Sequence, residues 1–98
     1  MIKFKDSNYA YILSNKRNTV LYIGVTSDLK KRMFQHKTKF YKGFASKYNL
    51  NKLVYYEKFE SIVDAIKREK QLKGIRRDRK EVLINEFNPD WNDLSLDM

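Results

Sequence analysis

The sequence contains no cysteine and a single histidine, His36. Without cysteine the chain forms no disulfide, offers no thiol nucleophile and builds no cysteine-based zinc site. A single histidine also excludes a site made of several imidazoles. Any metal ion bound by this chain is therefore expected to be a hard cation held by carboxylate and water.

Long apolar runs are missing as well. No run approaches the roughly 20 residues that a membrane-spanning helix needs. The first six residues, Met-Ile-Lys-Phe-Lys-Asp, do not resemble the apolar stretch of a signal peptide. We therefore expect a cytoplasmic protein with no membrane partner.

Positive charge is present in excess. Lysine and arginine number 21 against 12 aspartate and glutamate residues, and the net charge is +9. This balance favours a polyanionic partner, most simply nucleic acid, over a basic protein whose charge only keeps it soluble. The 98 residues are expected to form one domain, with a modest core over about residues 8–91 and a frayed, flexible tail over 93–98.

Two strands are predicted near the start of the chain. Apolar residues alternate along residues 9–13 and again from Thr19 to Val25, with a polar turn between the two segments. If this turn is short, Tyr11 lies directly opposite Tyr22, with both side chains on one face and the Cβ atoms about 5 Å apart. Aromatic residues are common in strands, so two tyrosines that merely stack on a core explain the pair equally well.

A helix from about Ser27 to Phe40 should follow the second strand. Gly24 is expected at the junction, where a missing Cβ lets another backbone or a ligand come close. Thr26 or Ser27 can cap the helix, and Asp28 in its first turn suits the helix dipole.

Two polar residues share the apolar side of this predicted helix. Arg32 and His36 stand four residues apart, on the face that also carries Leu29, Met33 and Phe40. Both polar groups should therefore point towards the body of the protein. A cation and the single imidazole aimed inward, next to a tyrosine, indicate a site.

The later elements complete a small sheet with helices. Residues 41–51 are predicted to form a loop or a weak helical turn. Lys52–Phe59 is apolar on both faces, which suits a central strand covered on both sides. Ser61 can cap a second helix that ends near Gly74, and a third helix should run from Arg77 to Phe87.

The expected architecture is therefore an α/β (α+β) domain. It has a three-stranded antiparallel sheet flanked by about three helices. Pro89 stops the third helix, and Trp91 is expected to dock on the core.

One acidic residue lies on the apolar side of the second helix. The expected buried stripe consists of Ile62, Ala65, Ile66 and Leu72. Glu69 falls on the same stripe, and an ionised carboxylate facing inward is costly unless it is paired or binds a metal ion. A salt bridge, to Arg32 or to Lys73 one turn along, and a functional role are both compatible with the helix geometry.

The segment from Lys67 to Lys80 is densely basic and is opposed only by Glu69 and Asp78. A charge run is usually a solvated face, but a one-signed excess beside an inward carboxylate favours phosphate binding. With two lysines of the first helix, the predicted nucleic-acid-binding residues are Lys30, Lys31, Lys67, Arg68, Lys70, Lys73, Arg76, Arg77, Arg79 and Lys80.

From Tyr9 to about Trp91 the chain resembles the GIY-YIG nuclease family, in its small stand-alone, single-domain branch. The segment over residues 9–13 stands where the family has its first motif, with Tyr11 as the motif tyrosine. The segment over residues 22–24 matches the second motif literally. One departure is Tyr9, which replaces the glycine of the first motif.

The resemblance extends to the predicted site. Arg32, eight residues after Gly24, falls at the family's catalytic arginine, and His36 stands where several members have a histidine. Glu69 matches the metal-binding glutamate, and Asn88 corresponds to a supporting asparagine near the end of the domain. Val25 replaces a lysine found in some members, so that lysine's role falls to His36 or another basic residue.

The resemblance implies a divalent-metal-dependent endonuclease that hydrolyses phosphodiester bonds in DNA, in repair, recombination or processing. Glu69 would hold Mg²⁺ or Mn²⁺, and Arg32 would brace the phosphate oxygens. A tyrosine, Tyr11 or Tyr22, would act as base, with His36 relaying the proton. The alternatives are a non-catalytic nucleic-acid-binding module, which needs no inward carboxylate, and a structural or protein-interaction domain, which leaves the charge unexplained.

Overall fold

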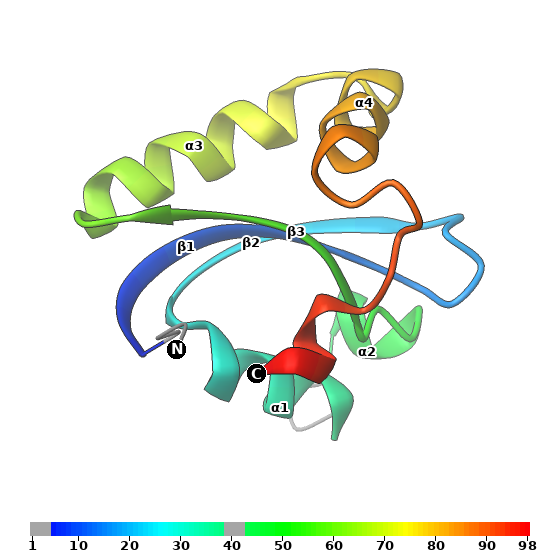
Figure 1. Ribbon diagram of the computed structural model, residues 1–98, viewed down its shortest axis with the longest axis horizontal. Helices are drawn as coiled ribbons and strands as arrows, with labels where there is room; N and C mark the ends of the chain where they lie inside the picture. Colours follow the sequence, from blue (N-terminus) through cyan, green and yellow to red (C-terminus); the bar gives the residue numbers. More distant parts are fainter. Residues whose placement is uncertain (1–4, 39–42) are drawn as a thin grey trace.

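The computed structural model describes residues 5–38 and 43–98. Figure 1 shows one antiparallel sheet of three strands, β1 (Lys5–Ser14), β2 (Leu21–Asp28) and β3 (Lys52–Phe59). The strand order is β2-β1-β3, so β1 is central and β2 and β3 are the edges. The predicted α+β architecture is confirmed, but β3, which was expected to be central, is an edge strand.

Helices cover both faces of the sheet. The helical segments are α1 (Leu29–Lys37), α2 (Phe44–Lys47), α3 (Ile62–Gly74), α4 (Arg77–Phe87) and the 3₁₀ turn η1 (Leu94–Asp97). In Figure 1, α3 and α4 lie on one face of the sheet, and α1, α2 and η1 lie on the other. None of the helices within 5–38 and 43–98 combines the length and the apolar surface that crossing a bilayer requires.

The central strand supplies both halves of the core. Every residue from Tyr9 to Ser14 is buried, and alternate side chains point to opposite faces. Tyr9, Tyr11 and Leu13 pack against Leu29 and Met33 of α1, whereas Ala10 and Ile12 belong to the cluster under α3 and α4. A strand used on both faces has no room for a polar side, which explains its apolar composition.

The register of the β1–β2 hairpin differs from the predicted one by two residues. Tyr11 lies opposite Gly24, and Tyr22 lies opposite Leu13. Directly opposed tyrosines were therefore the wrong prediction, although a two-residue shift keeps the facing of every side chain, so Tyr11 and Tyr22 still share a face.

Asn15 accounts for the wider turn. Its Oδ1 accepts hydrogen bonds from the backbone N–H groups of Thr19 (2.8 Å) and Val20 (3.1 Å). These two amides are therefore engaged within the turn, and pairing with β1 begins only at Leu21. Such local side-chain bonds to the backbone compete with the ladder of a sheet.

The cap of α1 also differs from expectation. β2 continues to Asp28, whose carboxylate accepts from the Lys31 N–H and caps the helix. Thr26 instead accepts a hydrogen bond from the Asp28 N–H. An aspartate has the stronger acceptor, and placing it first moves the helix start beyond Thr26 and Ser27. Phe40, the predicted helix end, lies outside the described residues.

The later elements follow the prediction closely. β3 and α4 have the predicted bounds, and Ser61 caps α3 by accepting from the Val63 N–H. The α2 turn falls in the segment predicted as a loop or weak helical turn. Ile62 and Ile66, however, are exposed rather than buried, because α3 meets the sheet through Ala65 and Leu72.

The C-terminal segment forms a 3₁₀ turn where a frayed tail was predicted. Asp93 caps η1 by accepting from the Ser95 N–H, and it also accepts from the Leu53 N–H of β3. Its second oxygen pairs with Lys37 of α1 at 2.5 Å. Leu94 and Met98 pack against the cluster under α1, and Trp91 packs against the core, as expected.

Candidate active site

Tyr11 reaches the edge of the sheet by crossing Gly24. A Cβ placed on Gly24 would lie 2.5 Å from Tyr11 Oη and 2.9 Å from its Cε1, so the outer half of the phenol ring rests on the glycine. Because β2 is an edge strand, this path brings the hydroxyl of a buried residue to the sheet edge. Gly24 lies within β2 and not at a strand–helix junction, and the group that approaches it is a side chain.

Three rings meet at this edge. Tyr11 Oη lies 3.2 Å from His36 Nε2, within hydrogen-bond distance. Tyr22 packs against both partners, with ring centroids 6.5 Å from Tyr11 and 5.8 Å from His36. The inward direction predicted for His36 is therefore observed.

The pKa values of the bonded pair move apart. The pKa of the Tyr11 hydroxyl is raised, mainly by burial and secondly by Tyr22. Arg32 has a smaller, lowering effect on this pKa, and Glu69 has a small raising effect. Burial, followed by Arg32, lowers the pKa of His36 below its ordinary 6.5. At neutral pH a protonated phenol therefore faces an uncharged imidazole, and Nε2 can accept its hydrogen bond.

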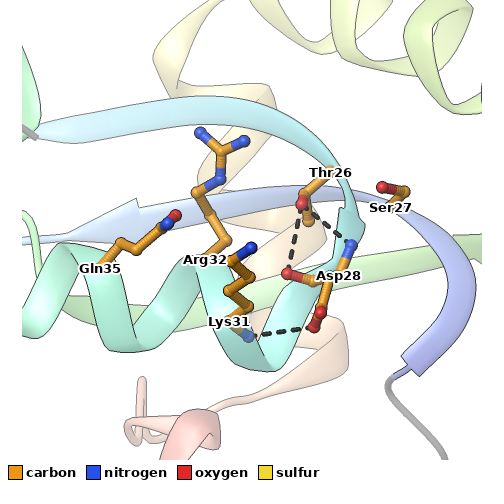
Figure 2. A pocket seen from close by; sticks show the side chains of 6 residues that line it. All are labelled: Thr26, Ser27, Asp28, Lys31, Arg32 and Gln35. Atoms are coloured by element: carbon orange, nitrogen blue, oxygen red, sulfur yellow. Dashed lines mark hydrogen bonds between the residues drawn. The ribbon is translucent and has the colours of Figure 1, made fainter.

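Arg32 joins this cluster to an open pocket of about 300 Å³. The pocket lies between the end of β2 and the first turns of α1 and is lined by Thr26, Ser27, Asp28, Lys31, Arg32 and Gln35. In Figure 2 the Arg32 side chain rises from α1 towards β2, away from the hydrogen bond that joins Asp28 to Lys31. Gln35, Thr26 and Ser27 were not predicted as residues of the site. Gln35 follows Arg32 by three residues, and this helical spacing could have indicated that it shares the face of Arg32.

Glu69 comes from the opposite face of the sheet. It lies on α3, which packs across β2 and β1, and its side chain is only 13% exposed. Its carboxylate pairs with Lys73 at 2.8 Å, one of the two partners considered from the sequence. Its charge also raises the pKa of the Tyr11 hydroxyl, so the carboxylate lies within electrostatic range of the tyrosine although it comes from the other face of the sheet.

An ion pair on the other flank of α3 fixes the helix in place. Arg68 Nε donates to Glu57 Oε2 of β3 at 2.9 Å, and the Tyr55 hydroxyl donates to the same oxygen at 2.5 Å. Arg68 thus ties α3 to the sheet, and the phosphate contact expected of it stays a prediction. Because Glu69 follows Arg68 by about 100° around the helix, this tie directs Glu69 towards β2.

The sequence over residues 7–82 matches the GIY-YIG catalytic domain. The chain belongs to the GIY-YIG family. A UPF0213 protein of Staphylococcus saprophyticus is 35% identical over 85 residues, which cover 83% of this chain and 98% of that protein. A UPF0213 protein of Clostridium perfringens is 39% identical over 82 residues, covering 80% of this chain and 83% of that protein.

A solved structure supports the same fold. The solution NMR structure of a UPF0213 protein from Bacillus halodurans is similar, with a TM-score of 0.56 and 25% identity, over 89% of this chain and 92% of that one. The family suggests a nuclease acting on nucleic acid, whereas the names of these relatives state no activity.

Asn88 stands apart from the GIY-YIG site. Its side chain is buried at the end of α4, where Nδ2 donates to the carbonyl oxygens of Val54 and Asn92, and Oδ1 accepts from the Asn92 N–H. Val54 lies on β3, the edge opposite β2. Asn88 therefore shapes the turn after α4, and its supporting role stays a prediction.

The predicted basic surface is divided by internal bonds. Arg77 donates to the carbonyl oxygens of Thr19 (2.6 Å) and Asn18 (2.7 Å), which ties α4 to the hairpin. Arg76 pairs with Asp78 on the surface. The predicted cations that remain exposed include Lys67 and Lys70 on α3, Arg79 on α4, and Lys30 and Lys31 on α1.

The donor set of this GIY-YIG site suits a loosely held hard cation. Among residues 5–38 and 43–98 no group of three or more acidic or histidine side chains is arranged for a metal ion. Glu69 would thus act as a single carboxylate ligand, and Mg²⁺ is commonly held by one or two carboxylates with water and substrate phosphate. Lys73 is 56% exposed, so its ammonium can leave Glu69 for solvent.

Proposed function

We propose that this GIY-YIG protein is a divalent-metal-dependent endonuclease that hydrolyses phosphodiester bonds in DNA, with a role in repair, recombination or processing. The observation that supports it is the gathering of an acid, a guanidinium and a bonded phenol–imidazole pair at one strand edge. Tyr11 Oη lies 3.2 Å from His36 Nε2, and the pKa of the Tyr11 hydroxyl is lowered by Arg32 and raised by Glu69, which supports a shared site for the four residues. A merely structural core does not require this set.

Each residue has a role that its surroundings allow. Arg32 would brace the phosphate with its forked donors, beside a pocket large enough for a phosphate group. Glu69 would hold Mg²⁺ or Mn²⁺. When bound, such a cation stabilises negative charge on the phosphate and on the leaving oxygen.

We assign the base to Tyr11 because its hydroxyl lies 3.2 Å from His36 Nε2, which can take up its proton. With a raised pKa it is not ionised beforehand at neutral pH. It can instead accept the proton of the attacking water while its own proton passes to His36 Nε2. Tyr22 would hold the two rings in contact.

The test compares two variants that remove the same ion pair. Glu69→Gln removes the carboxylate and should abolish cleavage while preserving folding and most DNA binding. Lys73→Met removes only the cation, so it should still cleave. Cleavage of a panel of duplex, branched and single-stranded DNA is measured with Mg²⁺ and Mn²⁺, beside the thermal unfolding midpoint.

If the pair were only structural, both variants would lose similar stability, of about 1 kcal/mol because the Lys73 cation is exposed, and neither would lose cleavage. Unchanged cleavage by folded Glu69→Gln therefore contradicts the proposal. Wild-type protein that binds DNA but cleaves no substrate with either metal would favour the non-catalytic module instead. Arg32→Ala should stop cleavage with some loss of binding.

A further inference from the structure

Phe34 is the most exposed aromatic side chain among those that the structure describes, at 66%. It follows Arg32 by two residues, which places it about 200° around α1, on the side away from the core. Exposing a ring of this size forfeits burial that would otherwise stabilise the fold. Phe34 belongs neither to the core nor to the residues that form the candidate active site.

The ring stands between two hollows. One, of about 440 Å³, is lined by Asp28, Lys30, Lys31 and Phe34. The other, of about 180 Å³, is lined by Lys30, Met33, Phe34, Lys37, Ser95 and Met98. Phe34 and Lys30 line both, so a flat group can lie beside the ring with an ammonium at its rim.

The larger hollow continues into the candidate active site. Asp28 and Lys31 line both this hollow and the pocket that contains Arg32 (Figure 2). A chain whose phosphate contacts Arg32 can therefore pass over Lys31 and reach Phe34 without crossing the core. The distance is short, because the path only goes around the first turns of one helix.

The charges around the ring fit a polyanion. Lys30 and Lys31 are exposed, and Lys37 is held by Asp93. The one carboxylate in the larger hollow, Asp28, is engaged in capping α1. A flat apolar surface with two ammonium groups beside it matches a nucleobase between phosphates, whereas an apolar peptide would gain nothing from the lysines.

We propose that Phe34, with Lys30 and Lys31, forms a nucleobase-binding subsite. One unpaired base stacks on the Phe34 ring, and the two lysines contact the flanking phosphates. The inference rests on the proposed function in taking nucleic acid as the ligand. The unpaired base can belong to DNA or RNA, since stacking uses the face that all bases share.

The experiment measures binding of fluorescein-labelled single strands by anisotropy, in EDTA so that nothing is cleaved. Phe34→Leu keeps an apolar side chain but loses the ring, and Phe34→Trp restores a ring. Leu96→Ala, which removes another exposed apolar side chain, is the matched control. A second series replaces one base at a time by an abasic site.

Phe34→Leu should weaken binding of a single strand roughly 5- to 100-fold, the range expected for one stacked base, and leave its salt dependence unchanged. Phe34→Trp and Leu96→Ala should bind as wild type does. One abasic position should weaken wild-type binding but leave Phe34→Leu unaffected. Replacing Lys30 and Lys31 by Gln should lower the salt slope, and blunt duplex should be indifferent to Phe34→Leu.

Equal affinity of Phe34→Leu and wild type, or an abasic effect that persists in Phe34→Leu, overturns the subsite. Parallel strands of DNA and RNA show which sugar is accepted. Protein that binds but never cleaves removes the proposed endonuclease and leaves the subsite standing. If the wild type cleaves DNA but Phe34→Leu binds single strands equally well, only the subsite is refuted. If the wild type binds no nucleic acid, both proposals are refuted.

Discussion

At the scale of single residues, Gly24 determines where Tyr11 can lie. The phenol ring occupies the space that any larger residue at this position would fill. The requirement at Gly24 is therefore steric: its backbone is ordinary strand, and no positive φ makes a glycine necessary there. The hydroxyl reaches His36 because this path across the edge strand is open.

Gly24→Ala should displace the Tyr11 ring and separate its hydroxyl from His36. We expect a loss of about 1–3 kcal/mol in unfolding free energy, as for other overpacked sites, together with loss of cleavage. Gly74→Ala is the control, because a Cβ there meets nothing within 4 Å. Urea denaturation and cleavage assays test both. A Gly24→Ala variant with wild-type stability and activity would refute the steric account.

Which residues form the site could be predicted from the sequence better than how they are paired. Helical spacing alone predicted that Arg32 and His36 point inward and that Glu69 lies on an apolar stripe. The same spacing could not choose between Arg32 and Lys73 as the partner of Glu69, since both were within reach of a carboxylate. The backbone bonds of Asn88 were not predicted, because a polar residue near a helix end satisfies backbone groups as readily as it supports a site.

At the scale of elements, α3 depends on the Glu57 carboxylate. Glu57 accepts from both Arg68 and Tyr55, and these side chains join the helix to β3. Burial and the bonded Glu57 raise the pKa of the Tyr55 hydroxyl to about 12. The phenol therefore stays protonated and remains a donor throughout the physiological range.

Glu57→Ala should cost about 1–3 kcal/mol of stability, because two donors lose a shared charged acceptor. Cleavage should fall as well, although less than in Glu69→Gln, since α3 can shift without losing the carboxylate. Arg76→Gln breaks a fully exposed ion pair and should stay within about 0.5 kcal/mol of wild type. Equal stability of Glu57→Ala and Arg76→Gln would argue against a stabilising role of the Arg68–Glu57 ion pair between α3 and β3.

The first and last residues of a helix or strand were predictable where a capping residue or a long apolar pattern allowed only one start and end. The bounds of β3 and α4 and the Ser61 cap are of this kind. The register of the hairpin was not predictable, because Asn15 binds two backbone amides that a shorter turn would have paired with β1. Ile62 and Ile66 matched a buried stripe, but α3 meets the sheet through Ala65 and Leu72, which leaves both isoleucine side chains exposed.

At the scale of the whole molecule, the cations that remain exposed lie on both sides of the sheet. Replacing Lys67 and Lys70 by Gln should lower the slope of log affinity against log salt for DNA by roughly 0.9 for each phosphate that is no longer neutralised. The same change at Lys16 and Arg17, exposed in the hairpin turn, should leave the slope unaltered. An equal slope in both double variants would place the DNA away from α3.

The C-terminal turn makes stability depend on pH through Asp93. Burial alone would raise the pKa of this carboxyl, but hydrogen bonds from Lys37, Ser95 and the Leu53 N–H outweigh it and lower the pKa. A lowered folded-state pKa stabilises the protein above the unfolded pKa of about 3.9, and that contribution is lost as the pH falls through the folded value.

Asp93→Asn should therefore destabilise the protein by about 1.5–3 kcal/mol at pH 7 and progressively less below about pH 4. Urea denaturation of both proteins at pH 7, 5 and 3 measures the difference. A difference in unfolding free energy between the two proteins that stays constant with pH would show that the charge of Asp93 does not contribute to stability. The sequence did not predict this turn, because two of the partners of Asp93, Lys37 and Leu53, come from segments far from it in the chain.

The placement of Glu69 on the far face of the sheet has a consequence for a chain that is still being made. The hairpin and α1 together carry Tyr11, Tyr22, Arg32 and His36, and all of them precede Glu69 in synthesis. On the proposed mechanism, these four residues cannot cut nucleic acid until α3 has docked across β2 and delivered the carboxylate. An unfinished or partly folded chain would thus be harmless to the nucleic acid around it, and activity would appear only with the complete fold.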